Sequence, residues 1–588
     1  MSISHRCWAA VMAAGIACSA LAGEAAGPIA WLRDDNAAFA EAKREHRFVL
    51  LYLEAVWCHW CHVMDEKTYG DAAVAAEVRA HYVPLRIDQD LRPDLSNRYK
   101  DYGWPATIVF DADGGEIAKR QGYVPADEFA ELLRAIVSDP SPEAVAQTPK
   151  PAAFAGTLSA SMRAELVKRH RETYDTALGG LTTAQKFLDR DSVEYALVAG
   201  ARGDADEAAM ARKTLDAAHA LIDPAWGGVY QYSTHADWQH PHYEKLATVQ
   251  GQYLRIYALA YAATKSAQDR DAALAIRRYL DAFLKSRDGA FYVSQDADLT
   301  PGEHSAEYFA LDDAARRARG VPRVDTNVYA LQNGQIIEAL ATWSEASGDA
   351  DALAEARRAA DWIVAHRALP GGGFRHDERD AAGPYLGDTL AMGRAFLALY
   401  RATADRAWLT RAASAATFIE SHFRATSAGY VSAETHGPIG SRPLLEENIA
   451  LARFANLLSR YTGDAHARAM AEHAMRHLAD PAVALDSLTE PGVLLADDEL
   501  ASEPLHLTVV GAKKDAQAAV LFAGVQHVFG AYKRTEWWDR DEGPLPNPDV
   551  NYPPVKRAAA FVCTSNRCSL PIFSADRIAE FLTADAAP

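Results

Sequence analysis

The feature that most constrains this chain is a turn that recurs through its middle, in which one or two glycines precede an aromatic or apolar residue. The six copies are Gly179-Gly180-Leu181, Gly227-Gly228-Val229-Tyr230, Gly289-Ala290-Phe291-Tyr292, Gly372-Gly373-Phe374, Gly429-Tyr430 and Gly492-Val493. Successive copies lie 48 to 83 residues apart, enough for two helices of ordinary length and their connections. Six turns therefore predict six helical hairpins, arranged as an α/α toroid with the turns at one mouth.

Helical periodicity between these turns supports the toroid. Apolar residues recur at the 3.6-residue spacing of a helix in segments 253–264, 334–347, 392–403 and 449–461. We place a six-hairpin glycosidase-like toroid at 153–500, after a Pro-rich linker at 139–152. Strand signals at 505–510 and 558–563, with a helix signal at 514–522, predict a small C-terminal α/β appendage at 501–588.

Residues 28–138 have a different pattern, in which strands and helices alternate. Strand signals occur at 48–54, 83–88, 107–110 and 116–122, and helix signals at 58–69 and 127–137. This order predicts a small mixed sheet flanked by helices. A chain of 588 residues is also too long for one hydrophobic core, so the fold class is multidomain, α/β followed by all-α.

The first residues are typical of a signal peptide. His5 and Arg6 precede a short apolar stretch that closes on the small-residue pattern Ala20-Leu21-Ala22, so we predict cleavage after residue 22 and export, to the periplasm. No other apolar run approaches the roughly 20 residues of a membrane span. The net charge of −19 disfavours nucleic acid as a partner.

Removal of residues 1–22 takes two cysteines away and leaves two close pairs, Cys58/Cys61 and Cys563/Cys568. In Cys58-His59-Trp60-Cys61, which follows a predicted strand, the first cysteine falls at a helix N-terminus, where backbone N–H groups stabilise a thiolate. We predict that Cys58 attacks, Cys61 resolves the mixed disulfide, and His59 tunes the thiolate.

A second element of this site is the turn Gly103-Trp104-Pro105. An X-Pro bond there could be cis and face the cysteines, which gives Pro105 a substrate-docking role. Two other interpretations stay open. The run Cys58 to His62 also fits the C-x-x-C-H pattern of covalent haem attachment, and the pair could be a structural disulfide or part of a zinc site, although zinc would lack a ligand. We predict no cofactor and no metal.

These residues resemble thioredoxin-domain proteins of the spermatogenesis-associated protein 20 type, which join a thioredoxin-like domain to an α/α toroid. The resemblance extends over nearly the whole mature chain. It rests on residues 57–64, 87–94 and 103–105, on 227–233 with Trp238 and Pro241-His-Tyr-Glu-Lys245, on Asp296-Ala-Asp298 and Asn333-Gly334, and on 561–563 with Cys568. It implies a redox-active first domain with thiol or disulfide partners.

The chain departs from this family within the toroid. Leu246-Ala-Thr-Val-Gln-Gly251 replaces the usual Leu-Tyr-Asp-Asn run, Gln332 stands where a Trp is usual, and Leu445-Glu-Glu-Asn448 replaces Pro-Ser-Gly-Asn. An activity proposed for the family's toroid is therefore less expected in this chain.

Toroids of this kind resemble those of glycosidases and sugar epimerases, which gather acids, histidines and aromatics at one mouth. The candidate ligand-binding residues are Tyr232, His242, Glu244, Asp296, Asp298 and Asp388. A glycosidase would need two of the carboxyl groups across the scissile bond, and an epimerase a histidine pair such as His240 and His242. The same acids could instead cap helices or be solvated, so we expect a cavity that binds a ligand, such as a carbohydrate, without chemistry.

The pair Cys563/Cys568 is predicted to be a structural staple, with an electron relay to Cys58 as the alternative. The leading hypothesis is an enzyme, a secreted thiol–disulfide oxidoreductase whose toroid recognises a partner or ligand. A carbohydrate-active or carbohydrate-binding toroid with an accessory thioredoxin-like domain is the runner-up. A non-enzymatic adaptor scaffold is the third hypothesis.

Overall fold

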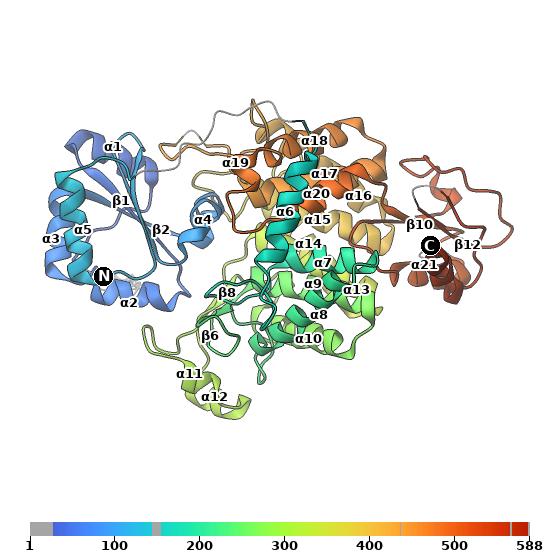
Figure 1. Ribbon diagram of the computed structural model, residues 1–588, viewed down its shortest axis with the longest axis horizontal. Helices are drawn as coiled ribbons and strands as arrows, with labels where there is room; N and C mark the ends of the chain where they lie inside the picture. Colours follow the sequence, from blue (N-terminus) through green and yellow to red (C-terminus); the bar gives the residue numbers. More distant parts are fainter. Residues whose placement is uncertain (1–27, 144–154, 436, 565–566, 586–588) are drawn as a thin grey trace, which may run out of the picture.

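A computed structural model describes residues 28–143, 155–435, 437–564 and 567–585. The predicted signal peptide and most of the predicted linker lie outside the described residues. Three units follow one another along the chain and along the long axis of the molecule, as Figure 1 shows. Among the described helices, none is both long and apolar enough to cross a membrane.

The N-terminal unit is built on a four-stranded sheet. Its strands are β1 (Phe48–Glu54), β2 (Tyr82–Asp88), β3 (Ala106–Phe110) and β4 (Glu116–Gln121), in the order β2-β1-β3-β4. The central strand β1 pairs parallel with β2 and antiparallel with β3, and its run of apolar residues is buried on both faces. This is the mixed sheet that the alternating pattern predicts.

Helices cover both faces of this sheet. They are α1 (Asp35–Glu45), α2 (His59–Lys67), α3 (Ala72–His81), α4 (Pro93–Tyr99) and α5 (Ala126–Ser138). Side chains of α3 and α5 form one apolar cluster with the sheet, while those of α1 and α4 form another on the opposite face. The unit therefore has the helix–sheet–helix layers of a thioredoxin-like fold.

The second unit is a double ring of helices. The inner helices are α7 (Arg190–Ala201), α9 (Ala247–Thr264), α13 (Ala330–Ser347), α15 (Leu386–Thr403), α17 (Leu445–Thr462) and α20 (Pro491–Ala501). The outer helices are α6 (Ala160–Glu172), α8 (Ala205–Ala218), α10 (Ala267–Tyr279), α14 (Ala350–Arg367), α16 (Arg406–His422) and α18 (Ala465–Leu478). Each inner helix contacts its two inner neighbours, and α20 closes the ring against α7. The predicted fold class is confirmed.

Short connections explain the hairpins. Only two or three residues separate several outer helices from the inner helix before them, and the side chains of Asp204, Asp349, Asp405 and Asp464 cap the N-termini of α8, α14, α16 and α18. An aspartate at this position satisfies free backbone N–H groups of the first turn and favours an abrupt helix start. The chain therefore reverses direction directly after each of these inner helices.

The glycine turns follow the outer helices. Five of the six are closed by a small antiparallel bridge, between Tyr174 and Leu181, Ile222 and Val229, Lys285 and Phe291, Ala368 and Phe374, and Arg424 and Tyr430. The sixth prediction is wrong, because Gly492 lies in the first turn of α20. The sixth pair of helices is formed instead by α20 and α6, which lie at opposite ends of the domain's sequence.

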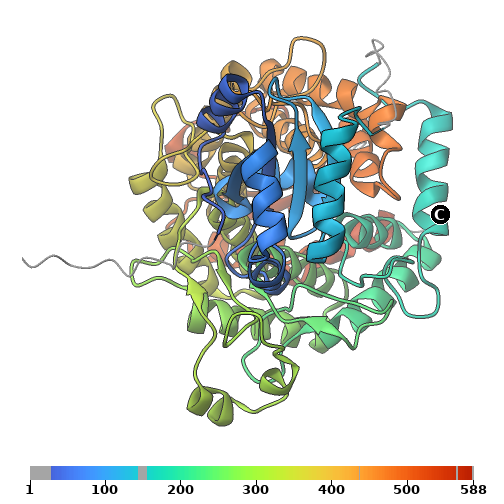
Figure 2. The same cartoon turned by 90° about the vertical axis from the view of Figure 1, so that its left-hand side faces the viewer.

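Loops between the outer and inner helices carry short elements at the mouth that faces the first unit (Figure 1). These are β5 (Tyr232–Ser233), β6 (Pro241–His242), β7 (Lys245–Leu246), β8 (Ser294–Gln295), β9 (Val324–Asp325), α11 (Ala306–Phe309) and α12 (Asp313–Arg319). Helix α19 (Pro481–Ala484) lies between α18 and α20. Figure 2 shows the sheet of the thioredoxin-like unit in front of the helical ring.

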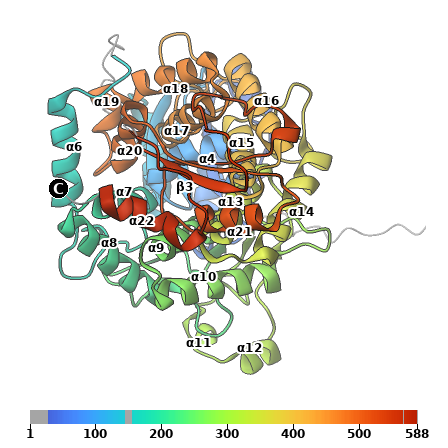
Figure 3. The same cartoon turned by 90° about the vertical axis from the view of Figure 1, so that its right-hand side faces the viewer.

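The C-terminal unit is a three-stranded sheet with two helices, α21 (Ala516–Gln526) and α22 (Ile578–Asp585). Its strands are β10 (Leu505–Val510), β11 (Lys533–Trp538) and β12 (Ala559–Cys563), in the order β11-β10-β12. Strand β11 was not predicted from the sequence. The unit lies against the opposite end of the ring from the thioredoxin-like unit, as Figures 1 and 3 show.

Candidate functional site

The cysteine pair lies at the start of α2, directly after the central strand. Cys58 is the N-cap residue of this helix, its Sγ accepts the N–H of Cys61 at 3.1 Å, and the two cysteines form a disulfide. The preceding Trp57 is fixed by a hydrogen bond from its Nε1 to Asp90 Oδ2 at 2.6 Å. A sulfur at a helix N-terminus faces free backbone N–H groups, which stabilise the thiolate when the pair is reduced.

Both cysteines are covered. Cys58 is 3% exposed and Cys61 0%, and they cluster with Trp104 from the first domain and with Leu246 from the toroid. The Trp104–Pro105 peptide bond is cis. The toroid therefore contributes to the cover of the cysteine pair.

Two histidines of the cysteine motif bind one aspartate of the toroid. His59 Nδ1 lies 3.0 Å from both carboxylate oxygens of Asp298, and His62 Nδ1 lies 3.2 Å from Oδ2. Burial raises the pKa of Asp298, but the hydrogen bonds with His59 and His62 outweigh it and lower that pKa to about 2. We call His59, His62 and Asp298 the latch, because they join the two domains beside the disulfide.

The latch favours a charged His62. Burial lowers the pKa of this imidazole, but the hydrogen bond with Asp298 and the charges of Asp296 and Asp298 raise it by more, so the pKa of His62 is raised overall. Its second nitrogen, Nε2, lies 3.2 Å from the carbonyl oxygen of Val56, which only accepts hydrogen bonds. Because each ring nitrogen of His62 faces a hydrogen-bond acceptor, both hydrogen bonds form when both nitrogens carry a proton.

Two further acids of the toroid lie beside the motif. Glu244 Oε1 accepts the N–H of His59 at 3.5 Å, and burial raises the pKa of this carboxyl to about 7. Asp296 Oδ1 accepts the N–H of Asp298 at 2.9 Å, and burial raises its pKa to about 6. One nitrogen or oxygen atom of each of His62, Asp296 and Asp298 lies within 4.8 Å of the others, so a cation could bind there only when the His62 imidazole is neutral.

The aromatic candidates lie in the same region. Tyr232 and His242 stack at 4.5 Å across the β5–β6 pair, and burial lowers the pKa of His242 to about 4, with the charges of His59 and His304 adding to this. His304, which the sequence did not single out, stacks on His59 at 5.1 Å. His240 is largely exposed and hydrogen bonded to Asp237.

Asp388 occupies a separate place at the start of α15. It accepts the N–H of Leu331 at 2.8 Å and lies 2.8 Å from His376 Nδ1. The other nitrogen of His376 donates to the carbonyl oxygen of Asp90 in the thioredoxin-like domain, at 2.6 Å. Asp388 therefore holds a second, buried contact between the two domains, which the sequence did not reveal.

The toroid encloses a central cavity of about 350 Å³ between its inner helices and the thioredoxin-like domain. Among the described residues that line it, none belongs to the six candidates predicted at the toroid mouth. Five of those six lie near the cysteines instead, and Asp388 pairs with His376. These acids and aromatics lie beside the histidines of the cysteine motif and not around the cavity.

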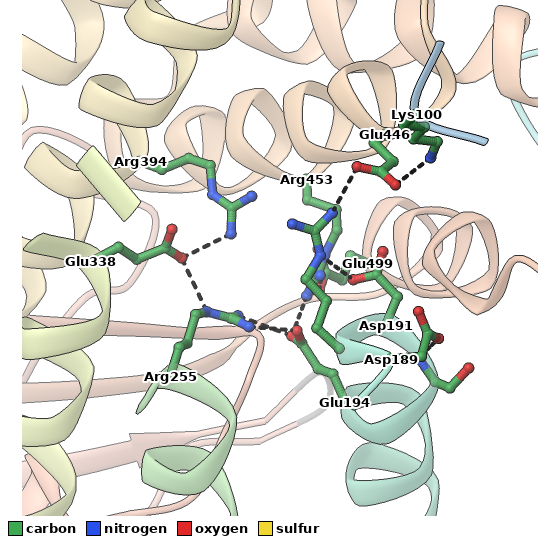
Figure 4. Close-up of polar contacts among 12 residues, drawn as sticks. Lys100, Asp189, Asp191, Glu194, Arg255, Glu338, Arg394, Glu446, Arg453 and Glu499 are labelled. Carbon is green, nitrogen blue, oxygen red and sulfur yellow. Dashed lines mark hydrogen bonds and ion pairs between the residues drawn. The ribbon is translucent and has the colours of Figure 1, made fainter. Parts of the chain in front are cut away.

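Six charged side chains from the inner helices lie next to one another (Figure 4), and five of them line this cavity. Five occupy the ninth position of α9, α13, α15, α17 and α20, and the sixth comes from α7; they are Arg255, Glu338, Arg394, Arg453, Glu499 and Glu194. Ion pairs of 2.6 to 3.1 Å link them in one chain, from Glu499 through Arg453, Glu194, Arg255 and Glu338 to Arg394. We call this chain the ion-pair floor.

The second cysteine pair is distant from the first. Cys563 and Cys568 form a disulfide next to a bridge at the end of β12. Their domain lies across the ring from the thioredoxin-like domain (Figure 1), whereas a relay requires it to fold back against that domain. The relay alternative is therefore contradicted, and the geometry is that of a local staple.

The chain is similar to several known proteins. A family model described as Thioredox_DsbH, a protein of unknown function (DUF255), matches residues 17–138. Spermatogenesis-associated protein 20 from rat is 25% identical over 312 residues, covering 47% of this chain and 39% of the relative, and the human protein is 24% identical over 310 residues, covering 47% and 39%. These matches support the resemblance to thioredoxin-like proteins of the spermatogenesis-associated protein 20 type. The uncharacterized protein B0495.5 of Caenorhabditis elegans is 26% identical over 312 residues, covering 47% and 43%.

The chain thus matches about two fifths of the length of these relatives. Among solved structures, cellobiose 2-epimerase from Spirochaeta thermophila matches 58% of this chain and 97% of its own, with 12% identity and a TM-score of 0.44. D-mannose isomerase matches 58% and 98%, with 10% identity and a TM-score of 0.44. A thioredoxin from Thermus thermophilus matches 18% and 85%, with 24% identity and a TM-score of 0.17.

Proposed function

We propose that the protein is a thiol–disulfide oxidoreductase that acts after export, in the periplasm. The observation that carries this proposal is Cys58 at the N-cap of α2 in a thioredoxin-like domain, with its Sγ on the N–H of Cys61. In the oxidising direction, a substrate thiolate attacks the Cys58 sulfur and forms a mixed disulfide, with Cys61 leaving as a thiolate. A second substrate thiolate then displaces Cys58, so the substrate gains a disulfide and the protein gains two thiols.

The other site residues have supporting roles in this proposal. His59, which follows Cys58 directly, tunes the thiolate, and the turn at Pro105 presents the substrate strand to the sulfur. Protein thiols or disulfides are the proposed substrates. Because the toroid loops cover Cys58, we assign the toroid a role in deciding when a substrate gains access.

The test is the redox equilibrium of Cys58/Cys61 against glutathione, in the mature chain with Cys563 and Cys568 changed to Ser. We expect a reversible two-electron couple between about −270 and −120 mV. Reduced Cys61→Ser should attack a disulfide substrate and hold it as a mixed disulfide, with the other substrate sulfur leaving as a thiolate, and Cys58→Ser, its matched control, should trap none. An inert pair, or a haem absorbance band on the purified protein, would contradict the proposal.

The carbohydrate-active alternative receives less support from the geometry. Its candidate acids Glu244, Asp296 and Asp298 lie against the cysteine motif and do not line the central cavity. We therefore propose no catalysis by these acids on a sugar. The adaptor hypothesis predicts that Cys58→Ser leaves the biological activity intact, so the same variant distinguishes it from the oxidoreductase.

A further inference from the structure

A chain of hydrogen bonds crosses from the toroid to the residue that precedes Cys58. Asp388, at the start of α15, accepts a hydrogen bond from His376 Nδ1 at 2.8 Å. His376 Nε2 donates to the carbonyl oxygen of Asp90 at 2.6 Å, and the carboxylate of Asp90 accepts the Nε1–H of Trp57 at 2.6 Å. We call Asp388, His376, Asp90 and Trp57 the clamp, because they connect an inner helix of the toroid to the cysteine motif.

The imidazole at the centre of the clamp has a fixed orientation. His376 is 1% exposed, and its ring is stacked on Tyr329, with the ring centres 4.3 Å apart and 12° between the planes. Its two nitrogens face acceptors on opposite sides, the carboxylate of Asp388 and the carbonyl oxygen of Asp90. Both nitrogens therefore carry a proton, and neither donor can leave its acceptor without breaking a buried hydrogen bond.

The clamp ends at the side chains that surround the disulfide. Trp57 is buried in one cluster with Cys58 and Cys61, and Cys58 Sγ accepts the N–H of Cys61 at 3.1 Å at the start of α2. Trp57 is the residue directly before Cys58, so a shift of Trp57 moves the sulfur relative to this N–H group. That contact stabilises the thiolate when the pair is reduced.

Other contacts hold the two domains together without His376. Ile439, from the toroid loop before α17, is buried in the apolar cluster that α1 and α4 form with the sheet. Arg98 of α4 donates to the carbonyl oxygen of Gly440 at 2.9 Å, and the latch is a third contact. Loss of His376 therefore leaves the domains docked, and its effect falls on the cysteine motif.

We propose that His376 of the toroid is a positioning residue for the redox site, which fixes Trp57 through Asp90 and so holds the Cys58 sulfur on the N-terminus of α2. This role rests on the thiol–disulfide chemistry proposed above. It goes further, because part of the reduction potential of the cysteine pair is then set by a residue of another domain. Loss of His376 weakens the hydrogen bond to the thiolate, destabilises the reduced pair and shifts the equilibrium toward the disulfide.

The test measures the redox equilibrium of Cys58/Cys61 against glutathione, in the full mature chain without the second cysteine pair. In His376→Gln, the amide carries its donors on one nitrogen and cannot bond to both acceptors. We expect a shift of about tenfold toward the disulfide, which corresponds to one hydrogen bond to the thiolate and lowers the potential by about 30 mV.

The matched control is His366→Gln in the same domain. His366 is exposed on α14, and its Nδ1 donates to the carbonyl oxygen of Trp362 at 2.8 Å within the same helix. This variant removes a histidine with a similar carbonyl contact but no connection to the thioredoxin-like domain. It should leave the redox equilibrium unchanged.

A double-mutant cycle shows whether His376 acts through Trp57. Trp57→Phe keeps an aromatic ring but removes the N–H that Asp90 accepts, so it should shift the equilibrium in the same direction. If His376 acts through this hydrogen bond, the double variant should match Trp57→Phe within about twofold. Two independent effects would instead multiply, to about a hundredfold.

The proposed function and the positioning role fail in different ways. An inert cysteine pair in the wild-type chain contradicts the oxidoreductase, and the role of His376 falls with it. A reversible wild-type couple overturns the positioning role alone if His376→Gln leaves the potential unchanged or if the shifts multiply in the double variant. Trp57→Phe decides the matter even where His376→Gln does not fold, because an unchanged potential in this variant removes the connection between the clamp and the sulfur.

Discussion

Replacing Asp298 by asparagine tests whether the latch keeps the disulfide covered. Both His59 and His62 bind this carboxylate, and its side chain is 1% exposed, with the two imidazoles at 11% and 18%. Asparagine keeps the shape of the side chain and one carbonyl acceptor, but it removes the negative charge. The substitution therefore weakens both charge-assisted hydrogen bonds without leaving a cavity.

The size of the effect follows from these two bonds. A hydrogen bond to a charged group contributes about 1.5–3 kcal/mol, and asparagine loses part of each of the two, about 2–4 kcal/mol in total. Burial of the latch means that solvent screens little of this. Since 1.4 kcal/mol is a factor of ten, the population of separated domains should rise about 30- to 700-fold.

The assay is the rate at which a phosphine reduces Cys58–Cys61, with the new thiols alkylated and counted by peptide mass spectrometry. When opening is fast, this rate is proportional to the open population, so it should rise by the same factor in Asp298→Asn. The control is Asp237→Asn, which removes the exposed partner of His240 from the same loop region. A rise of less than about threefold in a variant with wild-type thermal stability would refute the latch as the cause of the cover.

Three further predictions follow from the same region and from the second disulfide. The folded pKa of His62 is raised, so its stabilisation of the latch is fully present below about pH 6.5 and is lost as the pH rises through the folded pKa. The ratio of reduction rates between Asp298→Asn and wild type should therefore fall toward one above the folded pKa of His62. Glu244→Gln removes a charge that develops near pH 7 beside the N–H of His59, so the pKa of reduced Cys58 should fall by roughly one unit, measured by alkylation against pH. Changing Cys563 and Cys568 to Ser should destabilise the C-terminal domain by about 2 kcal/mol in denaturant melts and leave the Cys58/Cys61 equilibrium unchanged.

Local patterns in the sequence were enough for the elements and for the cysteine motif. The alternation of residues 28–138 predicted the strands β1 to β4, and the glycine turns predicted the toroid. Strand β11 was missed because its sequence, Lys533-Arg-Thr-Glu-Trp-Trp, does not alternate in hydrophobicity. Its charges are buried only because they are paired, Arg534 with Glu536 and Lys533 with Glu345.

The composition of the site could not be predicted, because it depends on contacts between domains. His59 and Asp298 are 239 residues apart in the sequence, and nothing near either residue indicates the other. Arg255 and Glu338 were equally hidden, since a charge on a helix indicates a solvent-facing side until the ring is known to enclose it. The sequence therefore indicated the candidate acids. The arrangement of the domains places these acids against His59 and His62 of the cysteine motif.

The pairing of α6 with α20 has a consequence for how the chain is made. The first outer helix has no inner partner of its own until residues 491–501 exist, so a ribosome must synthesise nearly the whole toroid before the ring can close. Until then, the apolar faces of α6 and α7 lack their cover, and such exposed faces are prone to aggregation. A fragment that ends before α20 should therefore be captured by chaperones, while the thioredoxin-like domain, whose sheet is complete by residue 121, can fold long before.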